Sequence, residues 1–250
     1  MARKTADLLK IVPDLLYPRR CPFCHDIAPV GLEACPSCLK KLPYVGEVRC
    51  RKCGKPVDST MVFCDDCMKT RRFFDEGRAA FRYDDLMRET IRFFKNKGRK
   101  EYGHVLGSML YECAKDDIAR WDADLILPVP LHKAKLRQRG YNQAAVIAEE
   151  LSKSSGIPMR TDVLLRADRT AAMKSLDAAG RKRNLTGAFR VTEGKAALSG
   201  GCVPGAVILA DDIFTTGATM DECARTLKAA GAQSVYFLTV CIGGGEETIF

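Results

Sequence analysis

The hydrophobic pattern of the chain alternates short apolar runs with longer segments in which apolar residues recur at helical spacing. Apolar runs predict strands at residues 77–83, 122–130, 161–167, 205–212 and 234–242. Helical spacing predicts helices at 86–116, interrupted near Gly98, at 140–156, and from 219 to a stop at Gly231. Strands that alternate with helices form parallel sheets with right-handed crossovers, so the pattern predicts an α/β fold.

Length and composition limit the class of protein. The 250 residues suffice for one mid-sized domain and a small appendage, and 46% apolar with 28% charged residues is typical of a folded, soluble protein. No apolar run reaches the about 18 residues that span a bilayer, so we expect no membrane insertion. Asp7 and Lys10 interrupt the apolar positions at the N-terminus, which argues against a secretory signal and predicts a cytoplasmic protein.

The charge balance favours polyanionic partners. Lys and Arg total 40 against 31 acidic residues, a formal net charge of +9 that suits nucleic acid or phosphorylated metabolites. Residues 92–100 combine five basic residues with two phenylalanines, a composition that can hold single-stranded nucleic acid through phosphate contacts and base stacking. The alternative for this stretch is the end of an amphipathic helix with a solvated face.

Eight of the twelve cysteines form four Cys-x2-Cys pairs, each of which can turn two sulfurs toward one point. Two such pairs complete a four-sulfur shell for a structural Zn²⁺, with no open position for substrate. Ten residues separate the first Cys-x2-Cys pair from the second, and ten separate the third from the fourth. This equal spacing favours two tandem zinc ribbons over a cross-braced arrangement. The eight predicted ligands are Cys21, Cys24, Cys35, Cys38, Cys50, Cys53, Cys64 and Cys67.

Zinc is favoured over disulfides because disulfides require an oxidising compartment. Eight thiolates and two Zn²⁺ add −8 and +4, which changes the formal charge from +9 to +5. His25 follows Cys24 but is not needed as a ligand, and we expect it on the surface. The remaining cysteines are most simply small buried hydrophobes: Cys113, Cys202, Cys223 and Cys241.

The segment from Val207 to Thr219 carries the most chemical information. An apolar strand ends in Asp211 and Asp212, and a loop of hydroxyl-bearing and small residues then opens a helix. Backbone N–H groups and the helix dipole at such a loop can cradle a phosphate. The carboxylates would repel that phosphate, so they should accept hydrogen bonds from sugar hydroxyls; a sugar 5-phosphate suits this arrangement. The alternative is an ordinary helix start in which Thr219 and Glu222 form a capping box.

The same segment resembles the phosphoribosyl pyrophosphate (PRPP) signature of type I phosphoribosyltransferases. The whole chain resembles the ComF family, which is associated with DNA uptake, competence and natural transformation. Beside the cysteine pairs and the 207–219 segment, the resemblance rests on residues 127–132 (LPVPLH), 137–143 (RQRGYNQ) and 181–189 (RKRNLTGAF). It implies a type I phosphoribosyltransferase-like domain at 75–245 behind a double zinc-ribbon module at 15–70.

The resemblance also assigns roles to residues. Asp211 and Asp212 would hold the ribose hydroxyls as the catalytic candidates, and residues 169–190 would form a mobile flap, in which Met173 replaces a glutamine frequent in the family. The 5-phosphate would contact Thr215, Thr216, Gly217, Ala218 and Thr219. The pyrophosphate and its Mg²⁺ would meet the turn Pro128, Val129, Pro130 and Leu131. Cations that would stabilise the departing pyrophosphate are Arg137, Arg139, Arg181 and Arg183.

Two functions follow from these expectations. The first is a DNA-uptake protein that binds a PRPP-type ligand and single-stranded DNA, with a helicase-like competence partner. The second is an active Mg²⁺-dependent phosphoribosyltransferase that transfers the phosphoribosyl group from PRPP to an unidentified acceptor. Cradle residues occur in binders and enzymes alike, so the resemblance supports binding more directly than turnover.

Overall fold

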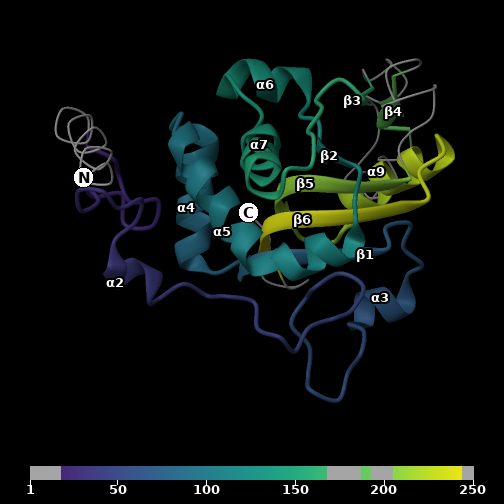
Figure 1. The fold of residues 1–250 in the computed structure, drawn as a ribbon, viewed down its shortest axis with the longest axis horizontal. Coiled ribbons are helices and arrows are strands. Elements are labelled where there is room, and N and C mark those ends of the chain that lie inside the picture. Colours follow the sequence, from purple (N-terminus) through teal and green to yellow (C-terminus); the bar gives the residue numbers. More distant parts are fainter. Residues whose placement is uncertain (1–17, 168–186, 193–204, 244–250) are drawn as a thin grey trace, which may run out of the picture.

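Four parallel strands form the central sheet (Figure 1). The computed structural model describes residues 18–167, 187–192 and 205–243. Within these, β1 (Glu76–Arg82), β6 (Ser234–Ile242), β5 (Ala206–Phe214) and β2 (Leu125–Pro128) lie side by side in that order. The last pair between β2 and β5 joins Pro128 to Ala210, so β5 continues beyond the end of its neighbour. The predicted parallel α/β sheet is confirmed.

Three helices cover one face of this sheet. They are α4 (Asp85–Asn96), α5 (Lys100–Trp121) and α7 (Gln143–Ser155), and their core includes Ile208 and Ala210 of β5. The predicted interruption between α4 and α5 falls at Gly98, whose φ of 67° lies in the left-handed region that glycine tolerates. None of the helices in the described part of the chain is long and apolar enough to cross a bilayer.

The opposite face carries α9 (Ala218–Ala229) and a separate two-stranded sheet of β3 (Leu164–Arg166) and β4 (Phe189–Val191). Residues 161–167 therefore contain a strand, but it pairs antiparallel with β4 and does not join the parallel sheet. Strands of a parallel sheet are usually buried on both faces. Only Leu164 is buried in β3, while Leu165 and Arg166 are half-exposed, so this strand suits an edge position.

The N-terminal module packs its two halves into different hydrophobic cores. Ribbon 1 (residues 21–38, with α2, Pro36–Leu39) contributes Cys21 and Phe23 to the core beneath α4 and α5. Ribbon 2 (residues 50–67, with α3, Asp65–Lys69) contributes Cys50 and Cys53 to the core beneath α9. Figure 1 shows α2 and α3 far apart below the sheet. The two ribbons thus belong to opposite faces of one sheet.

Candidate functional site

Two clusters of four cysteines lie in the N-terminal module. Within each cluster all four sulfurs are within 4.8 Å of one another. The first cluster holds Cys21, Cys24, Cys35 and Cys38, and the second holds Cys50, Cys53, Cys64 and Cys67. The pairing is therefore sequential, and the cross-braced alternative is wrong. Four mutually close thiol sulfurs suit a tetrahedral metal shell, and the clusters are consistent with two zinc sites.

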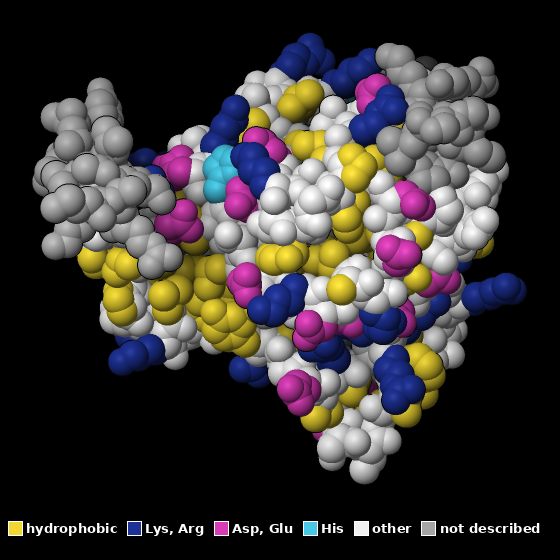
Figure 2. All heavy atoms as spheres, in the orientation of Figure 1, with side chains coloured by type: hydrophobic (Ala, Val, Ile, Leu, Met, Phe, Trp, Pro, Cys, Tyr) yellow, Lys and Arg dark blue, Asp and Glu magenta, His cyan; other side chains and the backbone are white. Residues whose placement is uncertain are grey.

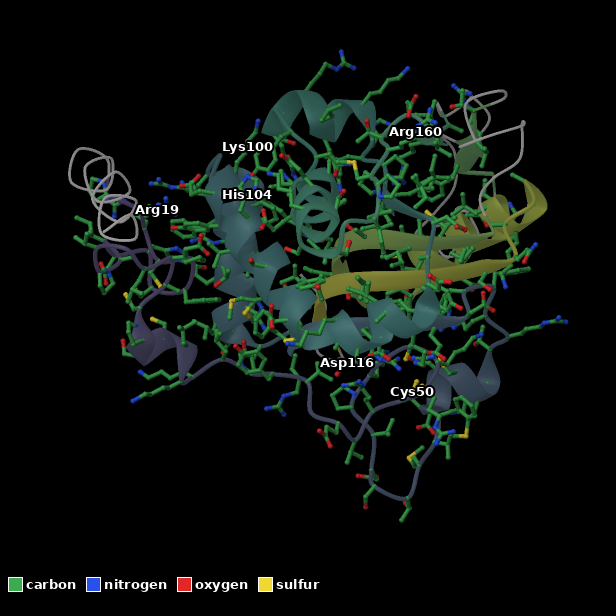
Figure 3. The ribbon with its side chains drawn as sticks, in the orientation of Figure 1. Arg19, Cys50, Lys100, His104, Asp116 and Arg160 are labelled. Atoms are coloured by element: carbon green, nitrogen blue, oxygen red, sulfur yellow. The ribbon has the colours of Figure 1, made fainter. Side chains whose placement is uncertain are left out.

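Each cluster is held by its surroundings. The N–H of Cys35 donates to Cys21 Sγ at 3.4 Å, a contact typical of metal-bound thiolates, and Cys21 is fully buried. Beside the second cluster, Lys55 Nζ donates to Asp66 Oδ2 at 2.6 Å. Figure 3 shows Cys50 on the side of ribbon 2 that faces α5, where Arg49 donates to Asp117 at 3.3 Å.

His25, which we expected on the surface, is half-buried against α4 and α5. Its ring stacks on Phe93 of α4 with centroids 3.7 Å apart, and its Nδ1 lies 3.2 Å from the hydroxyl of Tyr102 of α5. Burial lowers the pKa of this imidazole below its ordinary value. Its φ of 64° turns the chain immediately after Cys24, which brings the ring onto the helices. No local pattern indicates this contact, because residue 25 lies far from residues 93 and 102 along the chain.

The isolated cysteines do not share one environment. Cys223 and Cys241 are buried in the sheet cores, as expected. Cys113 on α5 is exposed, contrary to expectation, because it lies on the solvent side of a helix whose buried stripe runs through Leu110 and Ala114. Cys202 lies outside the described residues.

The two candidate acids lie inside β5 rather than at its end, and they face opposite sides of the sheet. Side chains alternate along a strand, and Ala210 and Leu209 belong to different cores. Asp212 accordingly meets α4, where Lys95 Nζ lies 3.0 Å from its Oδ2. Asp211 lies on the α9 side, and its Oδ1 accepts the N–H of Asp212 at 2.9 Å.

Electrostatics distinguish these two carboxyl groups. Burial, followed by the charge of Asp212, raises the pKa of Asp211 to about 7. Burial opposes the charge of Lys95, but the neighbouring Asp212 outweighs it and raises the pKa of Lys95. Asp211, with a pKa of about 7, is thus able to take or release a proton near neutrality.

The loop after β5 has the geometry of an anion cradle. Gly217 adopts a φ of 77° and is the N-cap of α9, so the capping box of Thr219 and Glu222, the alternative interpretation of this segment, does not form. Glu222 instead accepts the N–H of Gly187 at 2.7 Å. The N–H of Ala218 donates to Thr216 Oγ1 at 3.4 Å. In the described part of the chain, the N–H groups of the other four residues from 215 to 219 have no acceptor.

The turn after β2 is fixed against β5 and the start of α7. The N–H of Val129 donates to the carbonyl of Ala210 at 2.9 Å, and Asn142 Nδ2 donates to the carbonyl of Val129 at 3.0 Å. Both backbone groups of Val129 are thus used to support the turn. Pro130 and Leu131 are half-exposed beyond it, at the same sheet edge as the loop after β5.

A helix missed by the sequence analysis, α6 (Lys133–Arg139), brings cations to this edge. Arg139 donates to Gln143 Oε1 at 2.9 Å, while Arg137 is exposed. Figure 2 shows Lys and Arg side chains along the upper edge, where α6 lies in Figure 1. Arg181, Arg183, Met173 and residues 169–186 of the expected flap lie outside the described residues.

Four cations from three elements therefore surround the two aspartates. Burial, and then the charges of Arg139, Lys95 and Arg166, lower the pKa of Lys135. Lys95 and Arg166 also act on Asp211. The sequence analysis identified Arg139 but missed three members of this cation cluster: Lys95, Lys135 and Arg166. Of these three, only Lys95 lies in a stretch with a basic signal, residues 92–100, for which a contact with single-stranded nucleic acid and a solvated helix end were the two interpretations.

Comparison with known proteins shows which proteins this chain is similar to. A family model described as "Double zinc ribbon domain" matches residues 12–68. "Competence protein F" of Haemophilus influenzae is 29% identical over 224 residues, which cover 86% of this chain and 93% of that protein. "Competence protein ComFC" of Bacillus subtilis is 28% identical over 215 residues, 83% of each chain. Over most of its length the chain is therefore similar to competence proteins of the ComF family.

Relatives in this family also carry the name "DNA utilization protein YhgH". The Escherichia coli K12 protein of that name is 25% identical over 233 residues, which cover 91% of this chain and 98% of that protein. Among solved structures, a purine phosphoribosyltransferase from Pyrococcus horikoshii aligns with 56% of this chain and 88% of its own at 14% identity and a TM-score of 0.31. A similarity at that TM-score supports no conclusion about fold or ligand.

Proposed function

We propose that this chain binds a phosphorylated sugar of the PRPP type, with Mg²⁺, at the edge of the sheet beyond β5 and β2. The observation that carries the proposal is the loop from Thr215 to Thr219, which lies at the N-terminus of α9 and whose backbone N–H groups, except that of Ala218, have no acceptor in the described part of the chain. An anion at this position gains both the amide donors and the positive end of the helix dipole.

Different residues around the loop would contact different parts of the ligand. The partly exposed carboxyl of Asp211 lies next to the loop and would accept a hydrogen bond from a ribose hydroxyl. Arg139 and Lys135 of α6 would meet the pyrophosphate, whose negative charge is complementary to the cation cluster. Mg²⁺ would accompany the pyrophosphate and offset part of its charge. Lys95 lies 3.0 Å from Asp212 Oδ2, so one oxygen of this carboxyl is already engaged.

Calorimetry with PRPP and Mg²⁺ tests the proposal. The wild-type protein should bind, and Asp211→Asn together with Asp212→Asn should lose at least about tenfold in affinity, the cost of about one hydrogen bond to a charged group. Asp116→Asn is a matched control, because Asp116 is exposed on α5 on the lower side of the sheet, away from α6 (Figure 3). Equal affinity of the double variant and wild type would remove the pocket assignment.

We further propose that the chain binds single-stranded DNA through the exposed face of α6. The phenylalanines of the 92–100 stretch do not offer a stacking surface, because Phe94 is fully buried and Phe93 lies under His25. The basic residues of this stretch are also engaged, for example Lys95 with Asp212 and Arg99 with Glu101. On α6, by contrast, Arg137 is exposed.

Salt dependence of binding tests this second part. If phosphates dominate, the affinity for a single-stranded oligonucleotide should fall steeply with salt, and Arg137→Ala should reduce the slope of log K against log salt by about 1. Arg88→Ala is a charge-matched control on α4, where Arg88 pairs with Asp85. A flat salt response would contradict phosphate binding. Phosphoribosyl transfer and a helicase-like partner stay predictions. An assay for pyrophosphate released from PRPP when an acceptor is added would detect the transfer reaction.

A further inference from the structure

The segment that leaves ribbon 2 contacts the candidate phosphate loop and both ends of α9. Four consecutive residues, 72–75, make these contacts. Arg72 Nη2 donates to the carbonyl of Thr216 at 3.0 Å, and the N–H of Phe73 donates to Asp221 Oδ1 at 2.6 Å. These partners are separated by 144 and 148 positions in sequence, so the contacts are tertiary and join the zinc-ribbon module to the loop.

The next two residues complete the attachment. Phe74 is fully buried and meets Phe214, the last residue of β5, edge to face with ring centroids 6.1 Å apart. Asp75 lies 2.8 Å from Lys228 Nζ near the end of α9, and it also accepts the N–H of Val235 at the start of β6. The β5–α9–β6 unit is therefore held at its strand end, at its loop and at both ends of its helix.

The contact of Arg72 determines which way a loop amide points. In a trans peptide the C=O and the following N–H are directed to opposite sides of the peptide plane. Because Arg72 holds the carbonyl of Thr216, the N–H of Gly217 points away from the guanidinium and is left available. A charged donor on the carbonyl also polarises the peptide group, which strengthens the opposite N–H as a donor.

The guanidinium is itself held in place. It lies 6.0 Å from the centroid of the Phe74 ring, and its Nε is buried without a hydrogen-bond partner among the described residues. Its Nη1 would lie 3.4 Å from a Cβ added at Gly217, so the loop and the guanidinium are closely packed. Arg72 thus has one hydrogen-bonded contact to the loop, at the carbonyl of Thr216, and its guanidinium lies close to Gly217.

We infer that Arg72 is a positioning residue of the phosphate loop, which the zinc-ribbon module supplies to the ligand site of the sheet. The inference rests on the proposed function, since it assigns Arg72 a role in presenting the Gly217 amide to the ligand phosphate. It gives ribbon 2 a part in ligand binding that requires no contact between the metal and the ligand.

Two measurements on the full chain with bound zinc test the inference. In ligand-free protein labelled with ¹⁵N-glycine, Arg72→Met should move the Gly217 amide resonance, whereas Gly140, which lies after α6, should stay in place. In titrations with PRPP and Mg²⁺, Arg72→Met should lose about tenfold in affinity, the scale of one charged hydrogen bond. Arg72→Lys, which retains a cationic donor, should recover most of that loss. Arg71→Ala removes the same charge from an exposed neighbour and should change neither measurement.

The outcomes separate the inference from the proposed function. An unchanged Gly217 resonance, or an Arg72→Met affinity equal to that of wild type, would overturn the role of Arg72. Equal losses in Arg72→Lys and Arg72→Met would also overturn it, because a donor to the carbonyl would then be irrelevant. If wild-type protein does not bind PRPP, the proposed function fails, while the Gly217 resonance still decides whether Arg72 fixes this peptide. Zinc content and circular dichroism show that each variant has folded.

Discussion

Lys95 Nζ lies 3.0 Å from Asp212 Oδ2 and joins the end of α4 to the middle of the central sheet. The side chains of Asp212 and Lys95 are only 11% and 23% exposed, so this ion pair is largely removed from water. Removing one partner of a buried pair leaves an uncompensated charge, whereas removing both avoids that penalty.

We therefore predict that Lys95→Met destabilises the protein by about 2–3 kcal/mol. The double variant Lys95→Met with Asp212→Asn should be less destabilised than the single variant, because no charge remains buried. Urea unfolding of the four proteins of this cycle measures the coupling. Additive losses would show that the two groups do not interact in solution.

A second prediction concerns pH. The folded-state pKa of Asp211 is raised to about 7 from an ordinary value of 3.8, so the folded protein holds this proton more tightly than the unfolded chain. The carboxyl's contribution to stability is thus lost as pH rises from about 4 through 7. Asp211→Asn should be more stable than wild type at pH 8, by about 1–2 kcal/mol, and the difference should vanish near pH 4.

Thermal or urea unfolding of Asp211→Asn and wild type across this pH range checks the prediction. Asp116→Asn, at an exposed position on α5, is the control and should show no such convergence. A constant difference between Asp211→Asn and wild type at all pH values would show that the carboxyl titrates normally.

A third prediction follows from the separate cores of the two ribbons. Cys53→Ser should weaken the second metal cluster and speed hydrogen exchange in α9, because Cys53 packs in the α9 core. Cys24→Ser should act on the first cluster and speed exchange in α4 and the start of α5, where His25 contacts Phe93 and Tyr102. Each variant is the other's control, and identical exchange patterns would contradict the separation of the cores.

A fourth prediction compares two glycines in the same backbone conformation. Gly217 and Gly140 have φ values of 77° and 78°, but an added Cβ would lie 2.6 Å from the Phe214 ring at Gly217 and would meet nothing within 4 Å at Gly140. Both alanine variants carry the left-handed strain of about 1 kcal/mol. In Gly217→Ala, overlap of the added Cβ with the Phe214 ring should lower the free energy of unfolding by about 1 kcal/mol more. Equal denaturation midpoints would show that Phe214 moves aside freely.

Local signals in the sequence predicted much of this fold. Cysteine spacing predicted both clusters, and hydrophobic periodicity predicted the parallel sheet, the interruption at Gly98 and the end of α7 at Gly156. These features depend on residues close together in the chain, so their patterns are visible without coordinates.

Tertiary contacts were not predictable in the same way. Lys95 belongs to a basic stretch that looks like a solvated helix end, and only the packing of α4 on β5 shows that it meets Asp212. His25 and Arg72 likewise find their partners across long sequence separations. The short strand β3 was misplaced because three residues carry too little pattern to distinguish an edge pair from a buried strand.

The placement of one ribbon against each face of the sheet has a consequence for dissection of the chain. A fragment beginning near residue 76 would keep every strand of the sheet yet lose the cover that Phe23 gives to one face and Phe74 to the other. Such a fragment would expose apolar surface on both sides and would aggregate rather than behave as an independent unit. The cysteine-rich segment is therefore part of the folded core, and removal of either ribbon would expose the core side chains on one face of the sheet to water.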